Sequence, residues 1–170
     1  MSNKVLLFNP RAVSSRNYRI PNSILQVAAA IDGQYDWIVV DGNREEDPWP
    51  QILAYLQSSE VKYFGCTAMP GPQLRQAIPL SKRIREQFPE VPIIWGGYFA
   101  SNQHKVVLES GFVDYVINGP GDHAFPALLD ALETGKDVTG INNLIYKNEQ
   151  GKITKTFKGK FIINTSLLIM

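Results

Sequence analysis

The stretch FGCTAMPGPQL, residues 64–74, contains a hydroxyl side chain at a position where it could hold a small molecule. Thr67 follows a strand-like run directly, and its hydroxyl can both donate and accept a hydrogen bond. Residues 70–95 separate this segment from Gly96 and Gly97, which also end a strand-like run. A ligand can press against the backbone at glycines because they have no side chain. The combination indicates a ligand-binding site.

Other strand-like runs end in residues of the same kind. Gly119 and Gly121 again leave the backbone uncovered, and Met69 and Tyr98 would give the opening an apolar wall. Taken singly, each of these features is more often an ordinary turn or connection. Their shared location at strand ends favours the binding interpretation.

The single cysteine and the two histidines are not expected to form a catalytic group. Cys66 is expected to be a small buried apolar residue, and His104 to lie on the surface of a helix. His123 follows a strand, but no neighbouring base accompanies it. We therefore expect neither catalytic residues nor a metal site made by this chain.

Composition is that of an ordinary globular domain. The chain has 170 residues, of which 44% are apolar and 19% charged, and its net charge of +1 argues against nucleic-acid binding. No apolar run approaches the ~20 residues of a membrane helix, and the start lacks a signal-peptide pattern. We expect a cytoplasmic domain without membrane contact.

Five short, almost continuously apolar runs predict strands that are covered on both faces. They are the segments 4–10, 36–43, 61–67, 91–97 and 113–121. The segments between them have apolar residues at every third or fourth position, which predicts helices. These segments place the following residues on their buried stripes: Ile24, Ala28 and Ile31; Trp49, Ile52 and Leu56; Ile78, Ser81, Ile84 and Phe88; and Phe125, Leu128, Leu129 and Leu132.

Alternating strands and helices predict a parallel sheet, because parallel neighbours need crossover connections. We expect an α/β, doubly wound, flavodoxin-like sheet of five parallel strands in the order 2-1-3-4-5. Residues 1–140 would form this Rossmann-like domain. Residues 141–170 read as a C-terminal β-hairpin around the turn NEQG, which would extend the sheet at its edge or mark the exit from the domain, followed by an apolar tail that a partner or further domain would cover.

Ligands of such sheets bind beyond the carboxyl ends of the strands. The spacing from Thr67 to Gly97 resembles the Ser-x-Leu and glycine-pair signature of cobalamin-binding domains. The segments 65–101 and 113–138 are also similar to the N-terminal cobalamin-binding domains of cobalamin-dependent radical S-adenosylmethionine enzymes. The likeness covers residues 4 to about 150.

The resemblance implies a role for each matching residue. The Thr67 hydroxyl would bind the nucleotide tail of cobalamin, and Gly96 and Gly97 would clear its path between the third and fourth strands. The remaining expected cofactor-binding residues are Asn9, Pro10, Met69, Pro70, Gly71, Tyr98, Gly119 and Gly121.

The sequence also departs from related domains. The loop after the first strand lacks the histidine that coordinates cobalt in better-known members, which implies base-off cobalamin without a histidine ligand. Pro120 stands where an acidic residue is common. No cysteine triad follows, so the iron–sulfur cluster and S-adenosylmethionine would belong to a downstream domain missing from this chain.

Two other functions remain open at this point. The chain could be a doubly wound recognition or structural module that has lost cobalamin binding, which Pro120 and the absent histidine favour. A flavin carrier or phospho-receiver is less favoured, because the first loop lacks a phosphate cradle and Asp41 ends the second strand.

Overall fold

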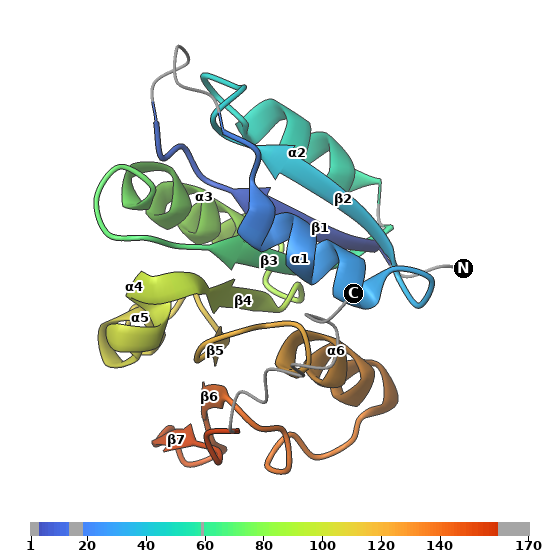
Figure 1. The fold of residues 1–170 in the computed structure, drawn as a ribbon, viewed down its shortest axis with the longest axis vertical. Coiled ribbons are helices and arrows are strands. Elements are labelled where there is room, and N and C mark those ends of the chain that lie inside the picture. The colour runs from blue at the N-terminus through green and yellow to red at the C-terminus, as the bar shows by residue number, and fades with distance from the viewer. Residues whose placement is uncertain (1–3, 14–18, 59, 160–170) are drawn as a thin grey trace, which may run out of the picture.

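The computed structural model describes residues 4–13, 19–58 and 60–159 as one layered α/β fold (Figure 1). Its seven strands are β1 (Lys4–Asn9), β2 (Asp36–Asp41), β3 (Val61–Thr67), β4 (Ile93–Gly96), β5 (Tyr115–Ile117), β6 (Leu144–Lys147) and β7 (Ile153–Lys155). Its six helices are α1 (Asn22–Ile31), α2 (Trp49–Gln57), α3 (Leu74–Gln87), α4 (Gly97–Asn102), α5 (His104–Glu109) and α6 (Ala124–Thr134).

All seven strands form one sheet in the order β2-β1-β3-β4-β5-β6-β7. The pairings from β2 to β5 are parallel, which confirms the predicted order of the first five strands. The sheet has seven strands rather than five, because the predicted hairpin, β6 and β7, adds two antiparallel strands beyond β5. The hairpin therefore continues the sheet at its edge.

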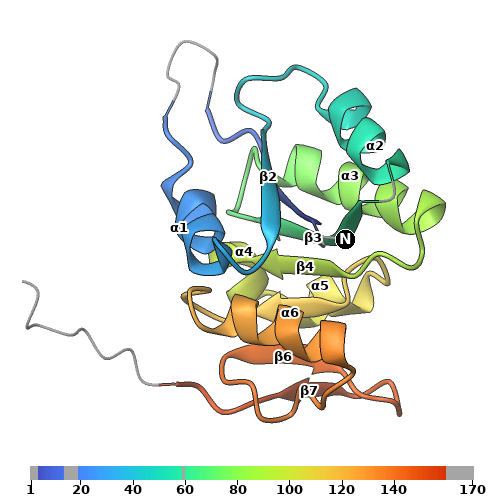
Figure 2. The ribbon, with the colours of Figure 1, turned by 90° about the vertical axis from the view of Figure 1, so that its right-hand side faces the viewer.

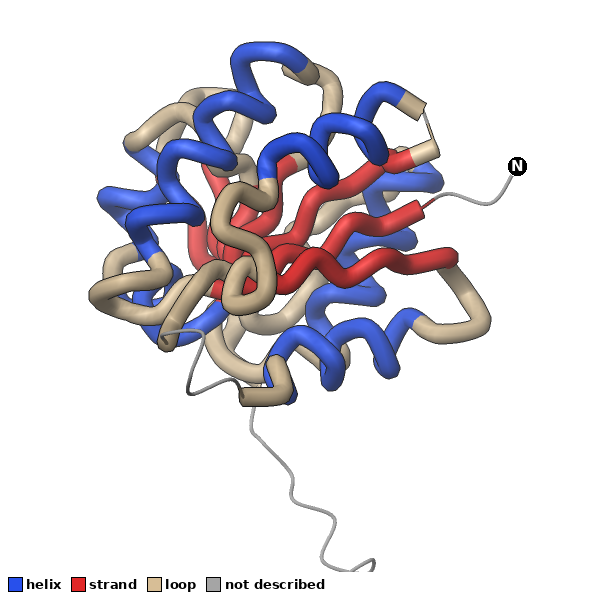
Figure 3. Tube along the Cα trace, turned by 90° about the horizontal axis from the view of Figure 1, so that it is seen from above, coloured by secondary structure: helices blue, strands red, loops and turns tan. Residues whose placement is uncertain are grey.

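Helices cover both faces of the sheet (Figures 2 and 3). Helices α1 and α6 pack on one face, against a buried apolar cluster that includes Leu7 and Ile94. Helices α2, α3, α4 and α5 pack on the other face, against a cluster that includes Phe8 and Trp95. The interior strand β1 is buried on both faces, which explains its apolar run without alternation.

The predicted buried stripes are confirmed in α1 and α2, and in α6 except that Leu132 is only partly buried. The stripe of α3 differs. There the buried residues are Ala77, Leu80, Ser81 and Ile84, and Ile78 is 41% exposed. The expectation that Ile78 is buried was wrong, because the side of the helix that faces the sheet is centred on Ala77, Ser81 and Ile84. Among the described residues, the structure has no helix that is long and apolar enough to cross a bilayer.

Candidate functional site

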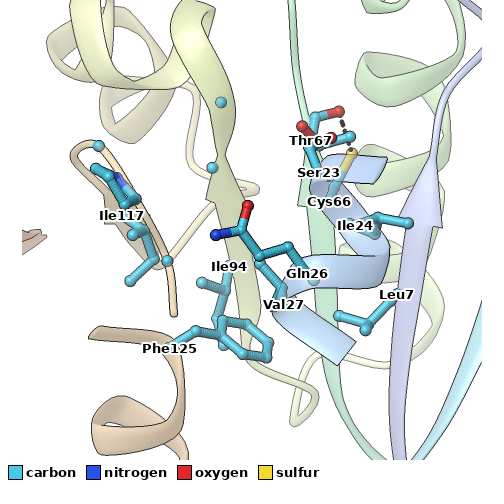
Figure 4. A pocket seen from close by; sticks show the side chains of 16 residues that line it. Leu7, Ser23, Ile24, Gln26, Val27, Cys66, Thr67, Ile94, Ile117 and Phe125 are labelled. Carbon is cyan, nitrogen blue, oxygen red and sulfur yellow. Dashed lines mark hydrogen bonds between the residues drawn. The ribbon is translucent and has the colours of Figure 1, made fainter. Parts of the chain in front are cut away.

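A pocket opens at the carboxyl ends of β3, β4 and β5, on the sheet face that α1 and α6 cover (Figure 4). It encloses about 150 Å³. Strand interiors form its floor, and glycine-rich strand ends and the first turns of α1 form its mouth. This position is where open α/β sheets bind ligands.

The floor of the pocket is set by the register of three adjacent strands. Leu7 of β1 lies opposite Gly65 of β3, which in turn lies opposite Ile94 of β4. Leu7 and Ile94 are buried, and Gly65, which has no side chain, leaves a depression between their side chains. The buried ring of Phe125, from α6, lies over this depression, so that a Cβ at Gly65 would stand 3.2 Å from the Phe125 Cζ atom.

The mouth of the pocket carries Thr67, two positions beyond Gly65 and therefore on the same sheet face. Thr67 is 8% exposed. Its side-chain hydroxyl makes no hydrogen bond to any residue that the structure describes. Gly96 lies opposite Thr67, and a Cβ there would meet no atom within 4 Å. The mouth thus combines an unpaired hydroxyl with open space.

The second glycine of the pair has a different role from the first. Gly97 has a φ of +89°, a conformation that L residues with side chains rarely adopt. A Cβ at Gly97 would stand 2.8 Å from the carbonyl oxygen of Ala68 and 3.0 Å from the Thr67 hydroxyl. The same Ala68 carbonyl accepts a 2.9 Å hydrogen bond from the Phe99 N–H. Gly97 therefore allows α4 to start directly against the end of β3.

The loop between β5 and α6 completes the mouth. The Ser101 hydroxyl donates to the Ile117 carbonyl at 3.3 Å and accepts from the Gly119 N–H at 3.2 Å, which ties this loop to α4. A Cβ at Gly119 would meet open space, whereas one at Gly121 would stand 3.2 Å from the Val27 Cγ2 atom of α1. Gly121 therefore permits close approach of the loop and α1.

A polar network lies at the neighbouring ends of β1 and β2. The Asn9 side-chain amide donates to the Asp41 carboxylate at 2.8 Å, and the Asn43 amide donates to the same oxygen at 3.0 Å. Gln73, 5% exposed, donates to the Pro10 carbonyl at 2.9 Å and accepts from the Met69 N–H at 2.8 Å. The loops after β1 and β3 are thus fastened together.

The remaining predicted residues form a rim outside the pocket. Met69 is 47% and Tyr98 61% exposed, and Pro70 and Gly71 are exposed beside them. Asn9 and Pro10 are buried at the end of β1. Of the eleven predicted cofactor-binding residues, Thr67, Gly96, Gly97, Gly119 and Gly121 line the pocket, and the other six lie at the same edge of the sheet without lining it.

Sequence reasoning missed the floor and the α1 side of the pocket. The missed lining residues are Leu7, Ser23, Ile24, Gln26, Val27, Gly65, Cys66, Ile94, Ile117, Pro120 and Phe125. Gly65 was a usable signal, because a glycine inside an apolar central strand marks a place where something approaches the sheet closely.

Cysteine and histidine contribute no obvious chemistry here. Burial raises the pKa of the Cys66 thiol, so the group stays protonated, and it donates to the Thr67 carbonyl at 3.4 Å. His123 is 98% exposed beside Asp122, and the His104 ring contacts the Ser101 carbonyl at 3.0 Å. In the described part of the chain, no group of three or more His, Cys, Asp or Glu residues is placed to hold a metal ion.

Comparison with known proteins identifies relatives over most of the chain. The family model of the B12 binding domain matches residues 10–129. An uncharacterized methyltransferase of Pyrococcus horikoshii is 25% identical over 134 residues, which make up 78% of this chain and 29% of that protein.

Solved structures share the fold. The radical S-adenosylmethionine methyltransferase TsrM from Kitasatospora setae, with cobalamin and a [4Fe-4S] cluster bound, matches with a TM-score of 0.77 and 22% identity over 96% of this chain and 30% of its own. The cobalamin-dependent radical enzyme OxsB, with aqua-cobalamin and S-adenosylmethionine bound, matches with a TM-score of 0.81 and 16% identity over 94% of this chain and 23% of its own. The chain spans less than a third of the length of each of these proteins. It belongs to the family of B12-binding domains.

Proposed function

We propose that the chain is a cobalamin-binding module that holds the nucleotide tail of cobalamin in the pocket and presents base-off cobalamin to a radical S-adenosylmethionine domain outside this chain. The observation that carries the proposal is the mouth of the pocket. The Thr67 hydroxyl, which has no hydrogen-bond partner among the described residues, lies next to Gly97, and the space at the neighbouring Gly96 is open, at the strand ends where this fold binds ligands.

The residues present fit the tail of cobalamin. The tail combines polar sugar and phosphate groups with an apolar benzimidazole base. The Thr67 hydroxyl and the exposed Ser23 and Gln26 of α1 suit the polar part. Buried Leu7, Ile94 and Phe125, at the floor, suit the base.

The rim would support the corrin ring. Met69 and Tyr98 present exposed apolar side chains next to the mouth, where burying them against a flat macrocycle would be favourable. The loop of Asn9 and Pro10 lies at the same edge and is held firmly by Gln73. We therefore propose that the predicted rim residues face the ring while the pocket takes the tail.

Base-off binding rests on the tail lying in the pocket, and the histidines of the chain bear on which ligand could replace the base. The chain has two histidines. His104, at the start of α5, contacts the Ser101 carbonyl of α4, and His123 is exposed before α6. Neither lies in the loop after β1, which would have to supply a replacement ligand for cobalt. We propose that this chain places no imidazole on cobalt.

The catalytic partner would lie outside this chain. When bound, cobalamin supplies cobalt–carbon chemistry, such as methyl transfer, to a catalytic domain. The lengths of the relatives support such a domain, since this chain matches less than a third of each. In this proposal residues 1–140 bind the cofactor and residues 141–170 lead toward the catalytic domain. The apolar tail 161–170 lies outside the described residues.

One experiment distinguishes the proposed cobalamin-binding function from the alternative, a recognition or structural module without cobalamin. The protein is mixed with hydroxocobalamin and desalted, and the colour of the protein fraction is measured. We expect wild-type protein to stay red and Gly96→Val to be colourless but folded, because Gly96 has an ordinary φ of −128° and its Cβ would fill the mouth without a clash.

Gly140→Val is the matched control, since a Cβ at Gly140 also meets no atom within 4 Å but lies outside the pocket. It should stay red. A colourless wild-type fraction would support the alternative module.

A further inference from the structure

The floor of the pocket has a chemical character of its own. Its side chains, those of Leu7, Ile94, Ile117 and Phe125, are apolar and at most 4% exposed. Gly65 lies in β3, which pairs with β1 on one side and β4 on the other, so its backbone groups belong to the sheet. Within the residues that the structure describes, the floor offers no polar side chain.

Polar side chains are confined to the mouth. Thr67 ends β3, and Ser23 and Gln26 lie in the first turns of α1, exposed to solvent. The Cys66 side chain belongs to the apolar cluster on the other sheet face, so it does not reach the floor. A molecule that enters the pocket therefore meets hydrogen-bonding groups first and an apolar surface last.

The depth of the floor is set by one contact. The far edge of the Phe125 ring rests on β3 at Gly65, where a Cβ would stand 3.2 Å from Cζ and 3.3 Å from Cε2. The same Cβ would stand 2.9 Å from the Leu7 Cδ2 atom. The ring of Phe125 thus closes the pocket between α6 and the sheet (Figure 4).

We infer that this floor selects the base of the nucleotide tail: it takes an apolar benzimidazole and rejects a purine, and Phe125 is the residue that limits the size of the base. The inference rests on the proposed function. A benzimidazole whose glycosidic nitrogen points to the mouth places its carbon edge on the floor, whereas adenine would bury an amino group and ring nitrogens there. Buried polar groups without partners are costly.

The first test compares three ligands with the wild-type chain. They are cobalamin, the analogue with adenine as its base, and cobinamide, which lacks the tail, and the affinity of each is measured by absorbance titration. We expect cobalamin to bind more tightly than cobinamide. The adenine analogue should bind roughly tenfold or more weakly than cobalamin, as expected for one unpaired buried polar group.

The outcomes separate the inference from the proposed function. Equal affinity for cobalamin and the adenine analogue, with cobinamide weaker, overturns the inference alone, because the tail then enters a pocket that does not select the base. Equal affinity for cobalamin and cobinamide, or no binding of either, overturns both the inference and the tail site.

The second test concerns size. A cobamide with a naphthimidazole base, which carries one more fused ring, should bind wild-type protein no better than cobinamide does. Phe125→Leu removes the ring edge that touches β3 and keeps the core apolar, so it should admit the larger base and raise that affinity about tenfold. Leu129→Val, a truncation on the same helix that does not line the pocket, should change neither affinity. Unchanged binding of the larger base by Phe125→Leu would overturn the role of Phe125.

A further variant, Gly65→Ala, should narrow the floor of the pocket, whereas Phe125→Leu enlarges it. Gly65→Ala places a methyl group 2.9 Å from the Leu7 Cδ2 atom and 3.2 Å from the Phe125 ring, so these two floor side chains must move or the strand must shift. We expect weaker binding of cobalamin and unchanged binding of cobinamide by the folded variant. An unchanged preference for cobalamin over cobinamide in this variant would contradict the assignment of Gly65 and Phe125 to the floor.

Discussion

Two neighbouring parts of one sheet edge are built in opposite ways. At the ends of β1 and β2, hydrogen bonds link the side chains of Asn9, Asp41 and Gln73 to one another and to the adjacent backbone, and within the described residues only the Asp41 Oδ2 atom is buried without a partner. At the ends of β3 to β5, glycines leave space and the Thr67 hydroxyl has no hydrogen-bond partner among the described residues.

The two ends of the sheet edge use their polar groups for different purposes. A closed network holds loops in one geometry, because breaking it would leave buried polar atoms unpaired. An open end with an unpaired hydroxyl contributes little to stability and is available to a ligand. We therefore expect substitutions at the closed end to act on stability and substitutions at the open end to act on binding. Gly97 is the instructive exception, because it lies at the open end but packs tightly.

The largest effect on stability is expected at Gly97. In Gly97→Ala the left-handed backbone costs about 1–2 kcal/mol and the crowded Cβ about 1–3 kcal/mol. The free energy of unfolding should therefore fall by roughly 2–5 kcal/mol. Gly96→Ala is the neighbouring control and should leave stability nearly unchanged, since its Cβ meets no atom within 4 Å. Urea denaturation of both variants measures the difference, and equal stability of the two would contradict the separate roles of the glycines.

A smaller loss is expected from opening the closed network at Gln73. Gln73→Leu leaves the Pro10 carbonyl and the Met69 N–H without their partner, which should destabilise the fold by about 1–3 kcal/mol. Gln87→Leu, an exposed position at the end of α3, the helix that begins directly after Gln73, should be nearly neutral. Thermal melting compares the two. A melting temperature of Gln73→Leu that equals that of Gln87→Leu would show that the network does not hold the loops.

The smallest effect is expected at Thr67, and on binding only. Loss of one neutral hydrogen bond should weaken cobalamin binding by about 0.5–1.5 kcal/mol in Thr67→Val, with little change in melting temperature. Thr67→Ser keeps the hydroxyl and should bind like the wild type. Titration of both variants with hydroxocobalamin measures the difference. Equal affinities of Thr67→Val and Thr67→Ser would show that the Thr67 hydroxyl does not contact the cofactor.

The order of the parallel strands could be predicted because each strand is an apolar run that a helix-period segment follows. The glycines at the strand ends were equally visible in the sequence. The two glycines of the pair could not be told apart, however, because the difference lies in the φ of Gly97 and in its distance from Ala68.

The floor of the pocket could not be predicted because it depends on register. Leu7, Gly65 and Ile94 are far apart in sequence, and only the pairing of β1, β3 and β4 places them in one row. The same holds for Gln73, whose partners lie on the loops after two different strands. The misplaced Ile78 shows a further limit: apolar spacing in α3 is compatible with two adjacent stripes, and packing chose the one that includes Ala77.

Electron paramagnetic resonance of the protein with cob(II)alamin tests the central claim most directly. A nitrogen ligand on cobalt splits the axial lines into triplets. If the tail lies in the pocket and this chain supplies no imidazole, the dimethylbenzimidazole is removed from cobalt and the lines stay single. Triplets that persist in the His104→Ala, His123→Ala double variant would mean that the base remains on cobalt, and the account of the pocket would be wrong.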